Sequence, residues 1–146
     1  MDIQATFAIS AAGMDLERVR YEVSAANLAN ANTVSGNARN GFQPLRVTAL
    51  AAAQIAGRGV GFDELVRQGL SGPGYQIEAA GVEARAAHDP GHPLADASGK
   101  VYYPAVDSAA EMMLMMSASR AYEANVAALN TGRTMAMRAL DIGSGG

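Results

Sequence analysis

The 146-residue chain contains no cysteine, no tryptophan and a single lysine, Lys100. Without cysteine it can form no disulfide, no thiolate ligand for zinc and no thiol nucleophile. Aromatic residues make up only 5% of the chain, although they bury the largest area per residue in a compact core. This scarcity favours long helices that pack on neighbours over a self-contained globule.

The chain also lacks an excess of positive charge and a long apolar run. Its formal net charge is −3, whereas a nucleic-acid surface needs clustered lysine and arginine. No apolar stretch reaches the roughly 18–20 residues that span a bilayer. Asp2 stands where a signal peptide has its basic region, and the first arginine is Arg18. We therefore expect a soluble chain that leaves the cytoplasm, if it does, without a cleaved signal peptide.

Residues 3–30 are predicted to form a long helix with one narrow apolar seam. Heptad positions a and d take Ile9, Ala12, Leu16, Val19, Val23, Ala26 and Asn30. The five charges between residues 15 and 22 fall outside these positions. Gly13 disfavours a helix interior but permits a close helix–helix approach. The asparagine-rich run over residues 27–33 ends the helix.

Residues 107–141 are predicted to form a second long helix. Pro104 precedes it, and Ser108 with Glu111 matches a capping box. The chosen register places Met112, Ser119, Val126, Arg133 and Leu140 at a, and Met115, Tyr122, Leu129 and Ala136 at d. Arg133 interrupts this seam.

Six of the eight methionines lie between Met112 and Met137. Four of them fall within residues 112–116 and point around more than one face of the helix. A helix that is apolar on several faces is one covered by several neighbours, and methionine suits irregular interfaces. The alternative, that these are core residues of one helix, stays open.

The middle of the chain is predicted to be β-rich or irregular. Strands are expected within residues 42–50, 75–86 and 100–103, and a short helix over 62–70. Turns are expected at residues 72–74, 89–91 and 97–99. The fold class is therefore mainly α, with the terminal helices paired as a coiled-coil-like unit and a small β-rich module between them. The expected domains are a discontinuous helical domain (1–34 and 106–142), a middle module (35–105) and a tail (143–146).

Two constellations could carry chemistry. His88, His92 and Asp96, with Asp89, lie within nine residues and could ligate a metal in a small metal-dependent enzyme. Two prolines and a glycine in that stretch favour tight turns instead. The glycines between residues 57 and 61 lack a phosphate-binding spacing and favour a flexible loop. No serine-centred nucleophile elbow accompanies either histidine, so we expect no cofactor, no metal and no enzymatic activity.

The asparagines have two interpretations. Asn30 and Asn125 could form cross-helix hydrogen bonds that fix the helix register, whereas capping is favoured for Asn27 and Asn32. A third function, binding to a membrane surface through the last helix, requires a basic polar face. Arg120, Arg133 and Arg138 are balanced there by Glu111, Glu123 and Asp141, which disfavours it.

Two segments resemble a known family. Residues 24–33, Ser24-Ala-Ala-Asn-Leu-Ala-Asn-Ala-Asn-Thr33, resemble the asparagine-rich signature near the N-terminus of the flagellar rod and hook proteins. Residues 89–107, DPGHPLADASGKVYYPAVD, resemble the proximal-rod members of that family, and the likeness continues to Thr131. It covers residues 3–34 and 84–142 and weakens over residues 50–80.

The resemblance implies a structural subunit of the proximal rod of the bacterial flagellar basal body, which spans the periplasm. Such proteins are exported without cleavage by the flagellar type III apparatus and fold fully on assembly. Their terminal helices pack into a helical tube that transmits torque from motor to hook. The implied partners are other rod proteins and further copies of the chain, with no nucleic acid and no membrane insertion. A different rod or hook paralogue remains the alternative.

The seams and the resemblance together predict an assembly interface on the two terminal helices. Its residues are Ile9, Leu16, Val19, Val23, Asn27, Asn30, Met112, Met115, Tyr122, Asn125, Val126 and Leu129.

Overall fold

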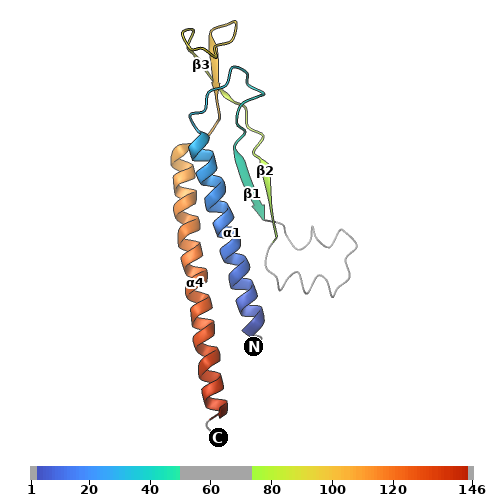
Figure 1. The fold of residues 1–146 in the computed structure, drawn as a ribbon, viewed down its shortest axis with the longest axis vertical. Coiled ribbons are helices and arrows are strands. Elements are labelled where there is room, and N and C mark those ends of the chain that lie inside the picture. The colour runs from blue at the N-terminus through green and yellow to red at the C-terminus, as the bar shows by residue number, and fades with distance from the viewer. Residues whose placement is uncertain (1–2, 50–73, 145–146) are drawn as a thin grey trace, which may run out of the picture. The chain divides into compact units, whose positions relative to one another are not determined.

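The computed structural model describes residues 3–49 and 74–144 (Figure 1). Its elements, in chain order, are α1 (Ile3–Asn30), β1 (Leu45–Ala49), β2 (Tyr75–Ala79), β3 (Arg85–His88), β4 (Lys100–Tyr103) and α4 (Ser108–Ser144). Both predicted terminal helices and the mainly α fold class are confirmed. The helix expected over residues 62–70, the turn at 72–74 and the glycine loop at 57–61 lie outside the described residues.

The strands form two two-stranded sheets. One pairs β1 with β2 and is called the β1–β2 ribbon, and the other pairs β3 with β4 in antiparallel orientation. In the second pair, Arg85 lies opposite Tyr103 and His88 opposite Lys100. The strand expected over residues 75–86 is in fact two, β2 and β3. Gly81 separates them with a φ of 64°, a left-handed conformation that an extended strand cannot contain.

The chain divides into two units, and both helices contribute to each. Unit 1 comprises Met1–Val19, Ala49–Gln76 and Ser117–Gly146, and unit 2 comprises Arg20–Thr48 and Ile77–Met116. Among the described residues, no helix combines the length and hydropathy that a membrane-spanning segment requires.

The stripe that α4 buries differs from the predicted one. Its buried or half-buried positions include Glu111, Met115, Ala118, Asn125, Leu129, Gly132 and Ala136, which follow a 3.5-residue repeat. The predicted d positions Met115, Leu129 and Ala136 belong to this stripe. Four of the five predicted a positions, Met112, Ser119, Arg133 and Leu140, are exposed, and the fifth, Val126, is half-buried. Gly132, and not Arg133, lies in the buried stripe, so Arg133 does not interrupt it.

α1 buries two stripes rather than one. The predicted residues Val19 and Val23 are buried, and Leu16 is half-buried. A second stripe of small and polar residues, namely Ser10, Gly13, Ser24 and Asn27, is buried or half-buried at helical spacing. Gly13 and Asn27 of this second stripe contact α4. In each unit α1 therefore has α4 on one side and the β1–β2 ribbon on the other (Figure 1).

Candidate assembly surface

Asn27 is the most completely enclosed polar side chain among the described residues, at 1% exposure. Its Nδ2 donates to the carbonyl oxygen of Leu45 and to Oε1 of Glu111, each at 2.9 Å. Its Oδ1 accepts the Leu45 amide proton at 2.8 Å. Both amide protons and the amide oxygen are thus used. The capping role predicted for Asn27 is wrong, because its side chain joins α1 to the start of β1 and to the first turns of α4.

Asn30, and not Asn27, makes local hydrogen bonds at the end of α1. Its Nδ2 donates to the carbonyl oxygen of Ala26 at 2.8 Å, and Thr33 Oγ1 donates to its Oδ1 at 3.4 Å. These bonds satisfy groups at the C-terminal end of α1, where carbonyl oxygens lose their helical partners. The cross-helix bond predicted for Asn30 is replaced by these local ones.

Asn125 packs directly over Gly13. A Cβ at Gly13 would lie 2.9 Å from both Nδ2 and Oδ1 of Asn125, a distance at which a neighbouring group must move. The close approach expected at Gly13 is therefore present, and any larger residue there separates the two helices or displaces the amide.

The N-terminus of α4 is capped by Asp107. Its Oδ1 accepts the amide protons of Ala109 and Ala110 at 3.0 and 3.2 Å, which is the N-cap arrangement. The predicted Ser108–Glu111 capping box is wrong, because the Glu111 side chain turns to Asn27 instead. Within the described residues, Glu111 Oε2 is buried without a hydrogen-bond partner.

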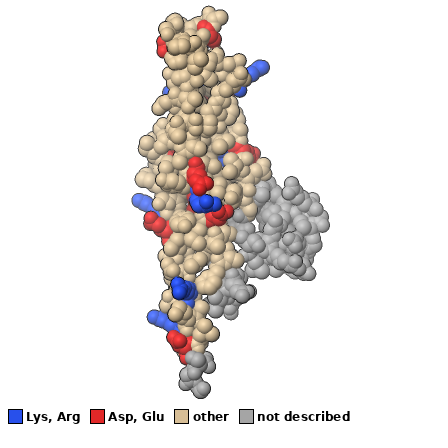
Figure 2. Space-filling model, in the orientation of Figure 1, with Lys and Arg blue, Asp and Glu red and all other residues tan. Residues whose placement is uncertain are grey.

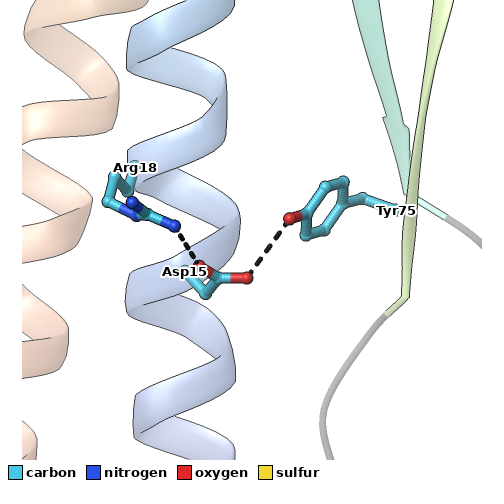
Figure 3. Close-up of polar contacts among 3 residues, drawn as sticks. All are labelled: Asp15, Arg18 and Tyr75. Carbon is cyan, nitrogen blue, oxygen red and sulfur yellow. Dashed lines mark hydrogen bonds and ion pairs between the residues drawn. The ribbon is translucent and has the colours of Figure 1, made fainter.

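A second polar link joins α1 to the β1–β2 ribbon in unit 1. Asp15 Oδ1 accepts a hydrogen bond from Arg18 Nη2 at 2.9 Å, and its Oδ2 accepts one from the Tyr75 hydroxyl at 3.3 Å (Figure 3). The Asp15 and Arg18 side chains are 48% and 60% exposed, and exposed ion pairs of this kind contribute at most about 1 kcal/mol. This link therefore adds little to the stability of the fold.

The residues of the alternative metal site serve a turn between β3 and β4. Asp96 Oδ1 accepts from Ser98 N at 2.8 Å, Ser98 Oγ at 2.7 Å and Lys100 N at 2.9 Å, and Oδ2 accepts from Tyr102 Oη at 3.1 Å. His92 Nδ1 accepts the Leu94 amide proton at 3.1 Å. Over residues 3–49 and 74–144, no three His, Asp or Glu side chains are grouped so that they could hold a metal ion.

These bonds lower the pKa of Asp96 from 3.8 to about 2, chiefly through the hydrogen bond from Ser98. A carboxyl whose pKa is lowered by folding stabilises the fold above its unfolded pKa and loses that contribution as the pH falls. We expect the β3–β4 turn to loosen on acidification from about pH 4 to pH 2, and Asp96→Asn to loosen it at neutral pH and remove that acid step. Amide proton exchange at Ser98 and Lys100, followed by NMR against pH, measures both effects, and an unchanged acid step in the variant would contradict the assignment.

α4 exposes large apolar side chains in both units. In unit 2, Met112, Met113, Leu114 and Met116 are 50–63% exposed. In unit 1, Met135, Met137, Leu140 and Ile142 are 56–83% exposed. Most of the face drawn in Figure 2 carries no charged residue. Exposed apolar groups gathered in this way mark surfaces that bind other molecules.

The structure separates the predicted interface residues into three sets. Val19, Val23 and Asn27 are buried within the chain. Leu16, Asn30, Met115, Asn125, Val126 and Leu129 are half-buried, and Ile9, Met112 and Tyr122 are exposed. The prediction omitted the exposed Met113, Leu114, Met116, Leu140 and Ile142. The apolar character of residues 112–116 on all faces was the signal that could have added the first three.

Comparison with known proteins gives a consistent result. The profile of the family described as "Flagellar basal body rod FlgEFG protein C-terminal" matches residues 97–142. The chain is 36% identical over 141 residues to the flagellar basal-body rod protein FlgC of Salmonella typhimurium, covering 94% of this chain and 95% of that protein. It is 33% identical over 144 residues to the FlgC of Bacillus subtilis, covering 92% and 94%. It is 35% identical over 143 residues to the FlgC of Yersinia enterocolitica, covering 98% and 99%.

Proposed function

Because the chain belongs to the FlgC family of flagellar basal-body rod proteins, we propose that α1 and α4 pack it into the helical tube that transmits torque from motor to hook. Its place is the bacterial flagellar basal body, where it is a structural subunit of the rod. The narrower assignment to the proximal rod is part of the proposal and is supported by the likeness along nearly the whole chain.

The observation that carries the proposal is the exposed apolar surface of α4. Eight large side chains of one helix are at least half exposed in the described part of the chain, and a monomer gains nothing from leaving them in water. Each becomes favourable when a neighbouring helix covers it. Methionine, with its flexible and polarizable side chain, adapts to neighbours that differ in shape.

We propose that the helical segments 1–34 and 106–142 form the rod-core domain and that residues 35–105 form the module beside it. The partners are other rod components, including further copies of this chain, and the flagellar type III export apparatus delivers it. The chain acts by packing and not by catalysis. Torque passes through many side-chain contacts between subunits. The parts of the terminal helices that lack contacts within the chain become fully ordered when those contacts form, because a helix without tertiary contacts is marginally stable.

The test is whether a charge in a helix seam prevents rod formation. Leu16→Asp and Leu129→Asp each place a carboxylate at a half-buried seam position, where its desolvation is costly. In a bacterium whose own gene is deleted, both variants should be produced at normal levels but fail to restore swimming or to enter isolated basal bodies. Ala11→Asp and Ala128→Asp, at exposed neighbouring positions, are the matched controls and should restore swimming. Normal motility with Leu129→Asp would count heavily against the proposal.

A further inference from the structure

Six of the seven asparagines are held by the fold in a way that hinders deamidation of the side chain. That reaction begins when the amide nitrogen of the next residue attacks the side-chain carbon Cγ, so it needs both groups to be free. Inside a helix the attacking nitrogen is engaged in the backbone hydrogen bond to the residue four positions earlier. This protects the asparagines in the interior of α1 and α4, which are Asn27, Asn125 and Asn130.

The asparagines at and just after the end of α1 are followed by amides that are also bonded. After Asn30, the amide of Ala31 donates to the carbonyl oxygen of Leu28 at 3.2 Å. After Asn32, the amide of Thr33 donates to the carbonyl oxygen of Asn30 at 3.0 Å. Neither nitrogen is therefore available to attack the preceding side chain.

Asn40 differs from these residues and from its neighbour Asn37. In Asn37 the side chain is engaged, because its Oδ1 accepts the Arg39 amide proton at 2.9 Å. Asn40 is exposed, and within residues 3–49 and 74–144 no hydrogen bond engages its side chain or the amide of Gly41. Both reacting groups are thus free, and the glycine carries no side chain that could shield the attacking nitrogen.

The packing of the chain favours a glycine at this position. A Cβ at Gly41 would lie 2.8 Å from Oγ of Ser35, and that hydroxyl donates to the carbonyl oxygen of Asn37 at 2.9 Å. Ser35 is itself fixed, since its backbone exchanges two hydrogen bonds of 2.9 Å with Tyr102 of β4. The close approach between Gly41 and Ser35 therefore places the least hindered residue type directly after Asn40.

We propose that Asn40 is a site of spontaneous deamidation. The nitrogen of Gly41 loses its proton and attacks Cγ of Asn40, the bond from Cγ to the side-chain nitrogen breaks, and that nitrogen takes up a proton and leaves as ammonia. Water then adds to a carbonyl carbon of the cyclic succinimide and opens the ring. Addition at Cγ gives aspartate, and addition at the main-chain carbonyl carbon gives isoaspartate, in which the main chain runs through the side-chain methylene.

The two products change the connection between α1 and β1 differently. This connection is fixed on one side by the pairing of Ser35 with Tyr102 and on the other by the bonds of Leu45 to Asn27. Isoaspartate lengthens the main chain between these fixed points by a methylene carbon, which displaces Gly41 from Ser35. Aspartate adds a negative charge at an exposed position and leaves the main chain as it was.

Mass spectrometry of the purified full-length chain measures the reaction. The chain is incubated at neutral and at mildly alkaline pH and then digested with pepsin at low pH, where the reaction is suppressed. We expect Asn40 to convert to aspartate and isoaspartate, faster at the higher pH because the attacking nitrogen must lose its proton, while Asn37 stays intact. Isoaspartate is identified by its labelling with an isoaspartyl methyltransferase. Asn40→Gln, whose longer side chain closes the ring poorly, is the matched control and should show no conversion.

A synthetic peptide of residues 37–44 gives the rate for a chain without the fold. The folded chain should convert at a similar rate. Conversion slower by about tenfold, which is a barrier higher by about 1.4 kcal/mol, would mean that the turn holds Asn40 and would overturn the inference. Conversion of Asn37 as fast as Asn40 would overturn it too.

Hydrogen exchange tests the expected effect on the backbone. In the isoaspartate form, the amide proton of Ser35 should exchange faster than in the unmodified chain, because the contact with Gly41 is lost. Asn40→Asp adds the charge without lengthening the main chain, so its Ser35 amide should exchange as in the unmodified chain. Unchanged exchange in the isoaspartate form, or equally fast exchange in Asn40→Asp, would contradict the inferred effect of the longer main chain.

Discussion

Replacing Asn27 with alanine should lower the free energy of unfolding by about 3 kcal/mol, because three groups of half-buried residues lose their partner at once. Each unsatisfied buried donor or acceptor costs roughly 1–3 kcal/mol. The amide and carbonyl of Leu45 and the Oε1 of Glu111 all bond to Asn27, and Glu111 Oε2 already lacks a partner within the described residues. Urea denaturation of the full-length chain, followed by far-UV circular dichroism, measures the loss.

Asn30→Ala is the matched control, on the same helix and of the same residue type. Among the described residues its side chain bonds to Ala26 and Thr33 alone, and it is half-buried, so its loss should cost less than about 1 kcal/mol. Asn27→Asp removes the amide protons and brings a second carboxylate beside Glu111, so it should also destabilise the chain. Adding Glu111→Gln should recover part of that loss. If the two alanine variants differ by less than about 0.5 kcal/mol, Asn27 does not hold the three elements together.

The ends of the helices could be predicted because their signals are local. The asparagine-rich run that follows Leu28 and the proline at 104 act on the backbone within a few residues. They place the end of α1 and the start of α4 where the structure has them, whereas α4 runs to Ser144, three residues beyond its predicted end at 141. The strand at Lys100–Tyr103 was equally predictable, since turn residues bound it on one side and Pro104 on the other.

The helix register could not be predicted because the pairing surface is not apolar. α1 meets α4 through Gly13 and Asn27, and α4 meets α1 through Glu111 and Asn125. A count of apolar residues in heptads excludes all four of these side chains. It therefore selected the neighbouring stripe on α1, with Val19 and Val23. On α4 it found the d positions of the buried stripe but placed most of the a positions one residue away from it. Small and hydrogen-bonded polar residues allow a closer approach than leucine and valine, but only the partner helix shows which of them is used.

The same reasoning explains the wrong role given to Glu111. Ser108 and Glu111 have the spacing of a capping box, but the sequence does not show that a buried amide, 84 residues away in the chain, competes for the carboxylate. Asp107 then takes over the cap from one position earlier. The long-range bond from Asn27 to Glu111 thus decides which residue caps α4, which the local spacing of Ser108 and Glu111 leaves open.

Met113→Asp/Met116→Asp should abolish rod assembly while leaving the isolated chain as stable as before. Both side chains are more than half exposed in the described structure, and surface substitutions of this kind change the free energy of unfolding by only about 0.5 kcal/mol. In an assembled rod the same positions are covered by a neighbour, and a buried carboxylate without a partner costs several kcal/mol. Urea denaturation of the purified chain and swimming of the complemented strain measure the two properties separately.

The control keeps the apolar surface and changes only its shape. Met113→Leu/Met116→Leu preserves volume closely, and such exchanges cost less than about 1.5 kcal/mol even in packed cores, so swimming should persist. Ser119→Asp, at an exposed polar position of the same helix, tests whether any added charge is harmful. A swimming strain with both aspartates would mean that this face stays in water in the rod. An unfolded chain would mean instead that the two methionines serve the fold. The predicted pairing of normal stability with lost assembly is what only an intersubunit surface produces.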